Sequence, residues 1–261
     1  MGKITEALRK AADDRLERID KINRIRERQE LVIQKIGDSK VDPRIVTYFD
    51  PKALISEQYK ILRTNVLSAN AKRPLKTLVI TSSLHSEGKT ITALNLAMAI
   101  AQSTQKPKVL LIDADMRRGR VARYLGVEQK TGLTEILTEK ADPSQTLFHI
   151  DIENLTFLSS GAVAENPAEL LASDGMQRLL ADMKTQFDHV IIDTPPIISV
   201  TDSGIIGALA DGVLLVIQAG RTQRGIVQRA TELLEQAHCK TIGHVLTNIE
   251  YHLPEYIYRY L

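Results

Sequence analysis

Short runs of Val, Ile and Leu alternate with stretches of helical periodicity over most of the chain, and this alternation limits the possible folds most strongly. The runs are continuous, as expected of strands buried on both faces of a parallel sheet. We predict strands at Thr77–Thr81, Val109–Asp113, Leu155–Leu158, His189–Asp193, Gly212–Gln218 and Ile242–Thr247. We predict helices at about Ser56–Ala69 and at Lys89–Thr104, Pro167–Gln186, Asp202–Leu209 and Arg224–Ala237. This order predicts an α/β protein with a doubly wound parallel sheet.

Length and composition narrow the class of protein further. A chain of 261 residues fits one large α/β domain with appendages, and its net charge of +2 does not indicate a nucleic-acid partner. The single cysteine, Cys239, cannot form an internal disulfide, which is typical of a reducing compartment. No apolar run approaches the roughly 20 residues that span a membrane, and the charged start from Lys3 has no signal-peptide core. We therefore expect a cytoplasmic protein that reaches a membrane through a partner or a surface contact.

The first 40 residues differ from the rest in their pattern of apolar and charged residues. This difference, together with the tail, divides the chain into three predicted regions. Apolar residues recur there every three or four positions among dense charges, which predicts an amphipathic helix: Ile4, Leu8, Ala12, Leu16, Ile19, Ile22 and Ile25. This helix could rest on its own domain, form a coiled coil or dock on a partner. With a linker near Asp38 to Pro43, we expect an extension at 1–45, a main domain at 46–249 and a tail at 250–261.

The segment VITSSLHSEGKT, residues 79–90, runs from a buried strand through a loop into a helix. This is the context of a P-loop, in which backbone N–H groups and a helix N-terminus bind phosphate. The predicted nucleotide contacts are Ser86, Glu87, Gly88, Lys89, Thr90 and Ile91. Lys89 would bridge the β- and γ-phosphates, and the Thr90 hydroxyl would bind Mg²⁺. The usual P-loop has a glycine where this chain has Ser83, and a fortuitous GKT in a strand–helix turn is the alternative.

Two further strands end in aspartates, at the carboxyl edge of the predicted sheet. VLLIDADMRRGR, residues 109–120, places Asp113 and Asp115 after one strand, and HVIIDTPP, residues 189–196, places Asp193 after another. Ligands of open α/β sheets bind at this edge. Asp193 and Asp113 are therefore predicted Mg²⁺ ligands together with Thr90, and Lys89, Asp113 and Asp115 are the predicted catalytic residues. Either Asp113 or Asp115 could instead cap the following turn.

Four of the seven tyrosines lie in the last eleven residues, at Tyr251, Tyr256, Tyr258 and Tyr260. Chain ends are commonly mobile, so a cluster of tyrosines at such an end is a plausible phosphoacceptor. The alternative is a terminal strand with Tyr256, Tyr258 and Tyr260 on one face. Asn248, after the last predicted strand, could bind the edge of a nucleobase or cap a turn.

These motifs resemble the bacterial tyrosine kinases of capsule and exopolysaccharide systems, in the form separate from its membrane anchor. The resemblance covers about residues 50–261 and includes GLTEIL (132–137), NPAELL (166–171) and ADGVLLV (210–216). The opening MGKITEALRKA is similar to the subgroup associated with exosortase gene clusters. The resemblance implies a P-loop NTPase fold of the deviant Walker A type and an ATP- and Mg²⁺-dependent autokinase that phosphorylates its tail between subunits. It further implies a membrane polysaccharide co-polymerase as activator.

The chain departs from the family pattern in two places. His85-Ser86 stands where the family has Pro-Gly, and the oligomerisation motif Glu-x-x-Arg-x-x-Arg has Lys60 between Glu57 and Arg63. Lysine keeps the charge but lacks the bidentate fork of arginine. Two alternatives stay open. A partition-type ATPase would carry a signature lysine where Leu84 stands, and a pseudokinase would only bind nucleotide.

Overall fold

The computed structural model describes residues 40–69, 75–128, 131–149 and 154–249. The chain divides into two units, residues 1–38 and 39–261, and every described residue belongs to the second. The predicted N-terminal helix and the four tail tyrosines lie outside the described residues. Among the helices that the structure describes, none is long and apolar enough to cross a membrane.

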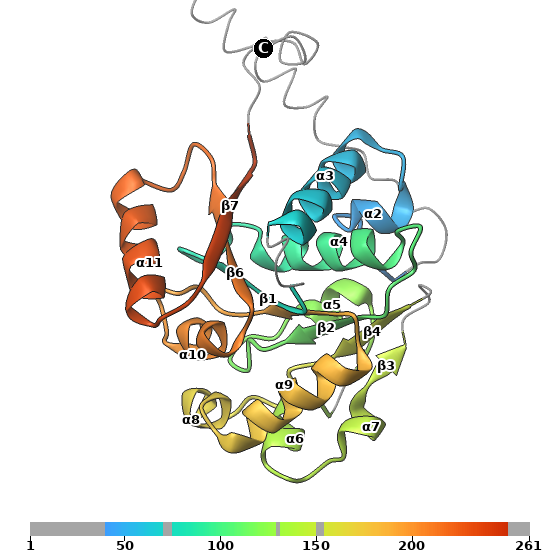
Figure 1. Ribbon diagram of the computed structural model, residues 1–261, viewed down its shortest axis with the longest axis vertical. Coiled ribbons are helices and arrows are strands. Elements are labelled where there is room, and N and C mark those ends of the chain that lie inside the picture. The colour runs from blue at the N-terminus through green and yellow to red at the C-terminus, as the bar shows by residue number, and fades with distance from the viewer. Residues whose placement is uncertain (1–39, 70–74, 129–130, 150–153, 250–261) are drawn as a thin grey trace, which may run out of the picture. The chain divides into compact units, whose positions relative to one another are not determined.

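In the described part of the chain, seven strands form one sheet in the order β3-β4-β2-β5-β1-β6-β7 (Figure 1). All neighbouring strands are parallel except β3 and β4, which are antiparallel. The strands are β1 (Thr77–Ser82), β2 (Val109–Asp113), β3 (Phe148–His149), β4 (Leu155–Leu158), β5 (His189–Asp193), β6 (Gly212–Gln218) and β7 (Thr241–Thr247). The predicted mostly parallel α/β sheet is thus confirmed.

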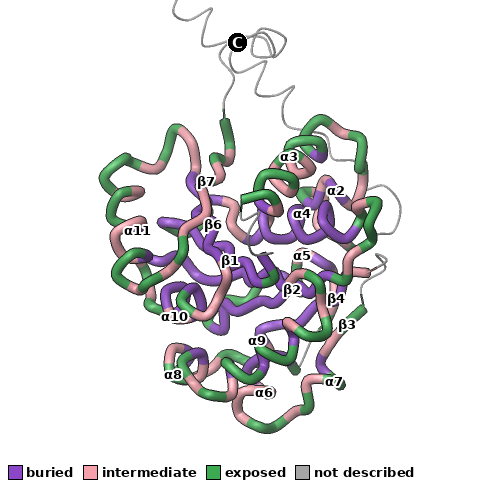
Figure 2. The backbone as a smooth tube through the Cα atoms, viewed as in Figure 1, coloured by how far each residue is buried: buried purple, intermediate pink, exposed green. Residues whose placement is uncertain are grey.

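Helices cover both faces of the sheet, as Figures 1 and 2 show. One face packs against α2 (Val46–Phe49), α3 (Leu54–Ser68), α4 (Lys89–Ala101) and α5 (Val121–Leu125). The other packs against α6 (Leu133–Leu137), α8 (Pro167–Leu171), α9 (Asp174–Gln186), α10 (Asp202–Leu209) and α11 (Arg224–Gln236), while α7 (Pro143–Thr146) precedes β3. Neighbouring strand residues serve opposite faces: Leu78 and Ile80 lie in one core cluster and Val79 in the other. Burial on both faces explains the unbroken apolar runs in the sequence.

The predicted strands agree with the structure to within one residue, whereas several helices differ. The helix predicted at Pro167–Gln186 is two helices, because the Ser173 hydroxyl accepts a hydrogen bond from Met176 N and starts α9 anew. The helix that begins at Lys89 ends at Ala101 and not at Thr104. Strand β3 and the four- and five-residue helices α2, α5, α6 and α7 were not predicted, because they are too short to show periodicity.

A buried asparagine fastens the segment before α3 to the helix that follows the P-loop. Asn95 of α4 accepts hydrogen bonds from the backbone N–H and hydroxyl of Thr47, at 3.0 and 2.9 Å. Its amide donates to the carbonyls of Arg44 and Ile91 at 3.1 and 2.9 Å. Ile45, beside this contact, is fully buried in the core. The start of the described chain is therefore packed against the helix that carries the P-loop lysine.

We predict that Asn95→Ala lowers the free energy of unfolding by about 2 kcal/mol or more, because it leaves the buried Thr47 N–H and Arg44 C=O without partners. Urea unfolding followed by circular dichroism measures the change. Asn65→Ala, at an exposed position of α3, is the matched control and should stay within about 0.5 kcal/mol of wild type. Equal effects of the two substitutions would contradict the structural role of Asn95.

Candidate active site

Three strand ends bring the predicted site residues to one edge of the sheet. In the strand register Asp193 is opposite Ile80 of β1 and also opposite Asp113 of β2. The loop at residues 83–88 leaves β1 at this edge and leads directly into α4 at Lys89. The parallel order of β2, β5 and β1 therefore places both acid-ended strands beside the P-loop.

The P-loop adopts left-handed backbone conformations at two positions. Gly88, the N-cap of α4, has φ of +94°, and Ser86 has φ of +66°. Glycine adopts this conformation without cost, whereas for serine it is uncommon. Ser86 thus takes the positive φ even though the family's glycine is missing there. Ser83, at the position of the usual first glycine, is fully buried, and its hydroxyl has no hydrogen-bond partner in the described structure.

The buried side chain of Glu87 stabilises the P-loop. Its carboxylate accepts hydrogen bonds from Leu84 N, at 2.7 Å, and from the Thr222 hydroxyl, and it is 2 % exposed. Its carbonyl accepts a hydrogen bond of 2.7 Å from the Thr247 hydroxyl at the end of β7. The Glu87 carboxylate therefore already has hydrogen-bond partners within the protein. The predicted contact of Glu87 with a nucleotide would then be made by its backbone N–H. Leu84, where a partition-type ATPase would have lysine, contributes its backbone N–H to this clamp.

The Lys89 ammonium lies among carboxylates at the carboxyl edge. Its Nζ is 3.3 Å from Asp193 Oδ2, 3.4 Å from Asp115 Oδ2 and 3.3 Å from the Thr90 hydroxyl. Thr90 in turn donates a hydrogen bond of 2.7 Å to Asp193 Oδ2. Burial opposes the charge on Lys89, but Asp193, Asp115 and Asp113 outweigh it and raise the pKa of the ammonium. Lys89, Thr90, Asp115 and Asp193, each predicted from sequence, thus form one cluster.

Asp113 occupies a different position from the one its predicted role suggests. Its two oxygens accept hydrogen bonds from backbone N–H groups, of Asp115 at 3.1 Å and of Val121 at 2.9 Å. The side chain is 1 % exposed and does not line the pocket. Burial, and then the nearby Asp193 charge, raise the pKa of the Asp113 carboxyl to about 7. Asp113 therefore shapes the turn that carries Asp115, as the capping alternative expected.

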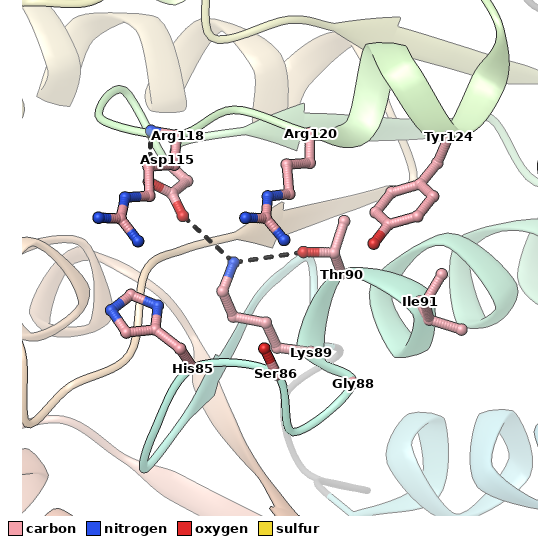
Figure 3. A pocket seen from close by; sticks show the side chains of 10 residues that line it. All are labelled: His85, Ser86, Gly88, Lys89, Thr90, Ile91, Asp115, Arg118, Arg120 and Tyr124. Atoms are coloured by element: carbon pink, nitrogen blue, oxygen red, sulfur yellow. Dashed lines mark hydrogen bonds and ion pairs between the residues drawn. The ribbon is translucent and has the colours of Figure 1, made fainter.

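A pocket of about 140 Å³ opens between the P-loop and the loop that follows β2 (Figure 3). Six of its lining residues were predicted from sequence: Ser86, Gly88, Lys89, Thr90, Ile91 and Asp115. Four were not: His85, Arg118, Arg120 and Tyr124. The basic run after Asp115 was the available signal for the two arginines, whereas nothing in the sequence pattern distinguished Tyr124. Asn248, with φ of +53°, follows β7 and does not line this pocket.

An ion pair ties the loop after β2 to the helix that follows β5. Asp202, at the start of α10, is fully buried, and Arg117 donates to its two oxygens at 2.9 and 3.1 Å. This bidentate contact is the strongest type of carboxylate hydrogen bonding, and the Asp202 carboxylate raises the pKa of Arg117. Arg117 is two residues after Asp115, so the pair fixes the loop from which Asp115 reaches Lys89.

A mostly parallel sheet with a P-loop, a buried lysine and acid-ended neighbouring strands defines a nucleotide-binding protein of the P-loop class. The comparisons agree, since the AAA domain family profile matches residues 76–242. The chain is 39% identical to the tyrosine-protein kinase YwqD of Bacillus subtilis over 216 residues, which cover 83% of this chain and 90% of that protein. It therefore belongs to the bacterial tyrosine-protein kinase family.

Solved structures show the same relationship. The kinase domain of the Escherichia coli tyrosine kinase ETK superposes with a TM-score of 0.74 at 31% identity, covering 80% of this chain and 83% of that one. The chimerical protein CapA2B2 superposes with a TM-score of 0.77 at 29% identity, covering 81% and 93%. The predicted P-loop fold and family are confirmed, whereas no comparison addresses the narrower exosortase-associated subgroup.

We predict that titration of Asp113 lowers the free energy of unfolding of the metal-free protein as the pH rises from about 4 to about 7. Its pKa rises from 3.8 to about 7 on folding, so the folded state binds the extra proton in this window and is stabilised at the acid end. Urea unfolding in EDTA at a series of pH values measures the slope. Asp113→Asn should flatten it, whatever its absolute stability. Parallel profiles for the two proteins would contradict the raised pKa.

Proposed function

We propose that this protein is an ATP-dependent protein-tyrosine autokinase that phosphorylates the tyrosine cluster of its own C-terminal tail. The observation that carries the proposal is the contact of the Lys89 ammonium with Asp193 and Asp115 at the start of α4, in a chain of the tyrosine-kinase family. Phosphoryl transfer depends on positioning and on neutralising charge, and this cluster offers a cation and carboxylates at the same edge.

The residues present fit ATP with Mg²⁺. The Lys89 ammonium contacts two carboxylates and a hydroxyl at the start of α4, and it is the cation that would pair with the phosphates of ATP. Mg²⁺ typically takes one or two protein carboxylates and otherwise binds phosphates and water. Asp193 would supply one carboxylate, and the adjacent Thr90 would supply a hydroxyl. No group of three metal-binding side chains occurs in the described ranges. Bound Mg²⁺ would neutralise charge on the phosphates.

In the proposed reaction the tyrosine oxygen bonds to the γ-phosphorus, the bond to the β-phosphate oxygen breaks and ADP leaves. Lys89 neutralises charge on the phosphates, and the phenol proton passes to a nearby carboxylate. Asp115 lines the pocket beside Lys89 and is placed for this task, while Asp113 orients Asp115 through its backbone N–H. We therefore assign the catalytic contact to Asp115 and a positioning role to Asp113, in place of the direct role first predicted for Asp113.

Transfer between subunits needs an oligomer, and α3 carries the predicted contact. Lys60 Nζ lies 2.7 Å from Glu57 Oε1 of the same helix, and Arg63 donates to the Ala99 carbonyl of α4 at 2.9 Å. The charged residues of the motif therefore already make hydrogen bonds and an ion pair within one chain. Three large apolar side chains of α3 are nevertheless exposed, Leu54, Ile55 and Ile61. We propose that this helix face joins neighbouring copies and that the charges add salt-sensitive pairs.

We further propose that the kinase regulates capsule or exopolysaccharide production with a membrane polysaccharide co-polymerase as its activator. The family assignment and the resemblance of the motifs support this role. Such a partner would bring a cytoplasmic protein to the inner membrane. No nucleic-acid partner is expected, because the net charge is only +2.

We predict that Lys89→Met lowers the rate of tyrosine phosphorylation by on the order of 100-fold or more, because it removes the buried cation that stabilises the transferred phosphoryl group. Phosphotyrosine formation from Mg·ATP, measured on the purified chain, gives the rate. Lys52→Met, at an exposed lysine outside the pocket, is the matched control. Near-normal phosphotyrosine in Lys89→Met would refute the proposed role of the P-loop.

A further inference from the structure

Two arginines of the pocket wall, Arg118 and Arg120, have no acidic partner in the described part of the chain. Both are exposed, and both line the pocket that contains Lys89. Neighbouring Arg117 is different, because buried Asp202 binds it in a bidentate contact. Two unpaired guanidinium groups in one pocket form a site for an anion, since each offers a planar set of N–H donors.

The two arginines lie on the side of the pocket opposite the P-loop. Figure 3 shows their side chains descending from the loop after β2 toward Lys89, with the P-loop below. In the proposed function the P-loop amides and Lys89 would face the phosphates of ATP. In phosphoryl transfer the attacking and leaving oxygens are roughly in line, so the acceptor approaches from the side away from the leaving group. Arg118 and Arg120 are therefore placed to meet the acceptor.

The tail contains anions next to some of its tyrosines but not others. Glu250 immediately precedes Tyr251, and Glu255 immediately precedes Tyr256. No other tyrosine of the chain follows an acidic residue: Ile257 precedes Tyr258 and Arg259 precedes Tyr260. A carboxylate beside the acceptor is the natural counter-ion for a free guanidinium.

We propose that Arg118 and Arg120 bind the carboxylate of the residue immediately before the acceptor tyrosine, so that the enzyme selects Glu-Tyr sequences. Tyr251 and Tyr256 are then the preferred acceptors, and Tyr258 and Tyr260 are used more slowly. This inference rests on the proposed kinase function and adds a selection rule to it. Arg118 and Arg120 determine specificity by binding the acceptor segment, while Lys89 and Asp115 carry the transfer.

Two full-length chains separate enzyme from acceptor in the test. The enzyme chain carries Phe at all four tail tyrosines, and the acceptor chain carries Lys89→Met. Initial rates at each tyrosine after addition of Mg·ATP are read by site-resolved mass spectrometry. We expect Tyr251 and Tyr256 to react about tenfold faster than Tyr258 and Tyr260, the usual worth of one charge-assisted hydrogen bond.

Changes to the acceptor chain leave the enzyme untouched. Glu255→Gln should slow Tyr256 about tenfold, and Ile257→Glu should accelerate Tyr258. On the enzyme chain, Arg118→Gln with Arg120→Gln should abolish the preference. Arg123→Gln, an exposed arginine of α5 outside the pocket lining, is the matched control and should preserve it.

The outcomes distinguish this inference from the proposed function. No phosphotyrosine at any position would refute the kinase itself. Phosphorylation that ignores Glu255→Gln and Ile257→Glu would overturn the selection rule and leave the kinase standing. An equal fall at all four tyrosines in the double arginine variant would also overturn the rule, because the arginines would then act on the nucleotide.

Discussion

The contact of the Lys89 ammonium with Asp193 and Asp115 is the interaction around which the candidate site is built. Each of these charges is costly to bury alone. The ammonium stabilises both carboxylates and is stabilised by them, whereas the two carboxylates repel each other. The cluster is possible only because the P-loop, β2 and β5 end at the same edge of the sheet. A bound triphosphate would replace Asp193 and Asp115 as the partner of the Lys89 ammonium. The two carboxylates would then face a metal ion and an acceptor hydroxyl. The residues that stabilise one another in this cluster are therefore the same ones to which the proposed reaction assigns the transfer.

A surrounding layer of hydrogen bonds keeps this cluster in place. Glu87 fastens the P-loop to the end of β7 and to Thr222, and Asp113 shapes the turn before Asp115. Arg117 and Asp202 join that turn to α10, across the strand that ends in Asp193. Such supporting contacts matter in catalysis because small displacements of the reacting groups cost large factors in rate.

Much of this arrangement could be predicted from sequence. There are physical reasons why the other parts could not be predicted. Strands buried on both faces produce long apolar runs, so their positions were predictable to within a residue. The GKT segment and the acid-ended strands also identify Lys89, Thr90, Asp115 and Asp193. The split at Ser173 was missed because its two helices together keep a helical pattern. The backbone contacts of Asp113 were not predictable, because sequence pattern cannot distinguish a carboxylate that accepts from amides from one that faces a ligand. Tyr124 reaches the pocket only through tertiary packing. The N-terminal helix and the tail stay predictions.

In the proposed function this site transfers phosphate to tyrosine and does not merely hydrolyse ATP. Intact-mass and peptide mass spectrometry of the phosphatase-treated wild-type chain, before and after incubation with Mg·ATP, tests it directly when inorganic phosphate release is measured in the same sample. We expect phosphate on tyrosines between residues 251 and 260, accumulating faster than inorganic phosphate. Steady release of inorganic phosphate from an unmodified chain would contradict it and favour a partition-type ATPase.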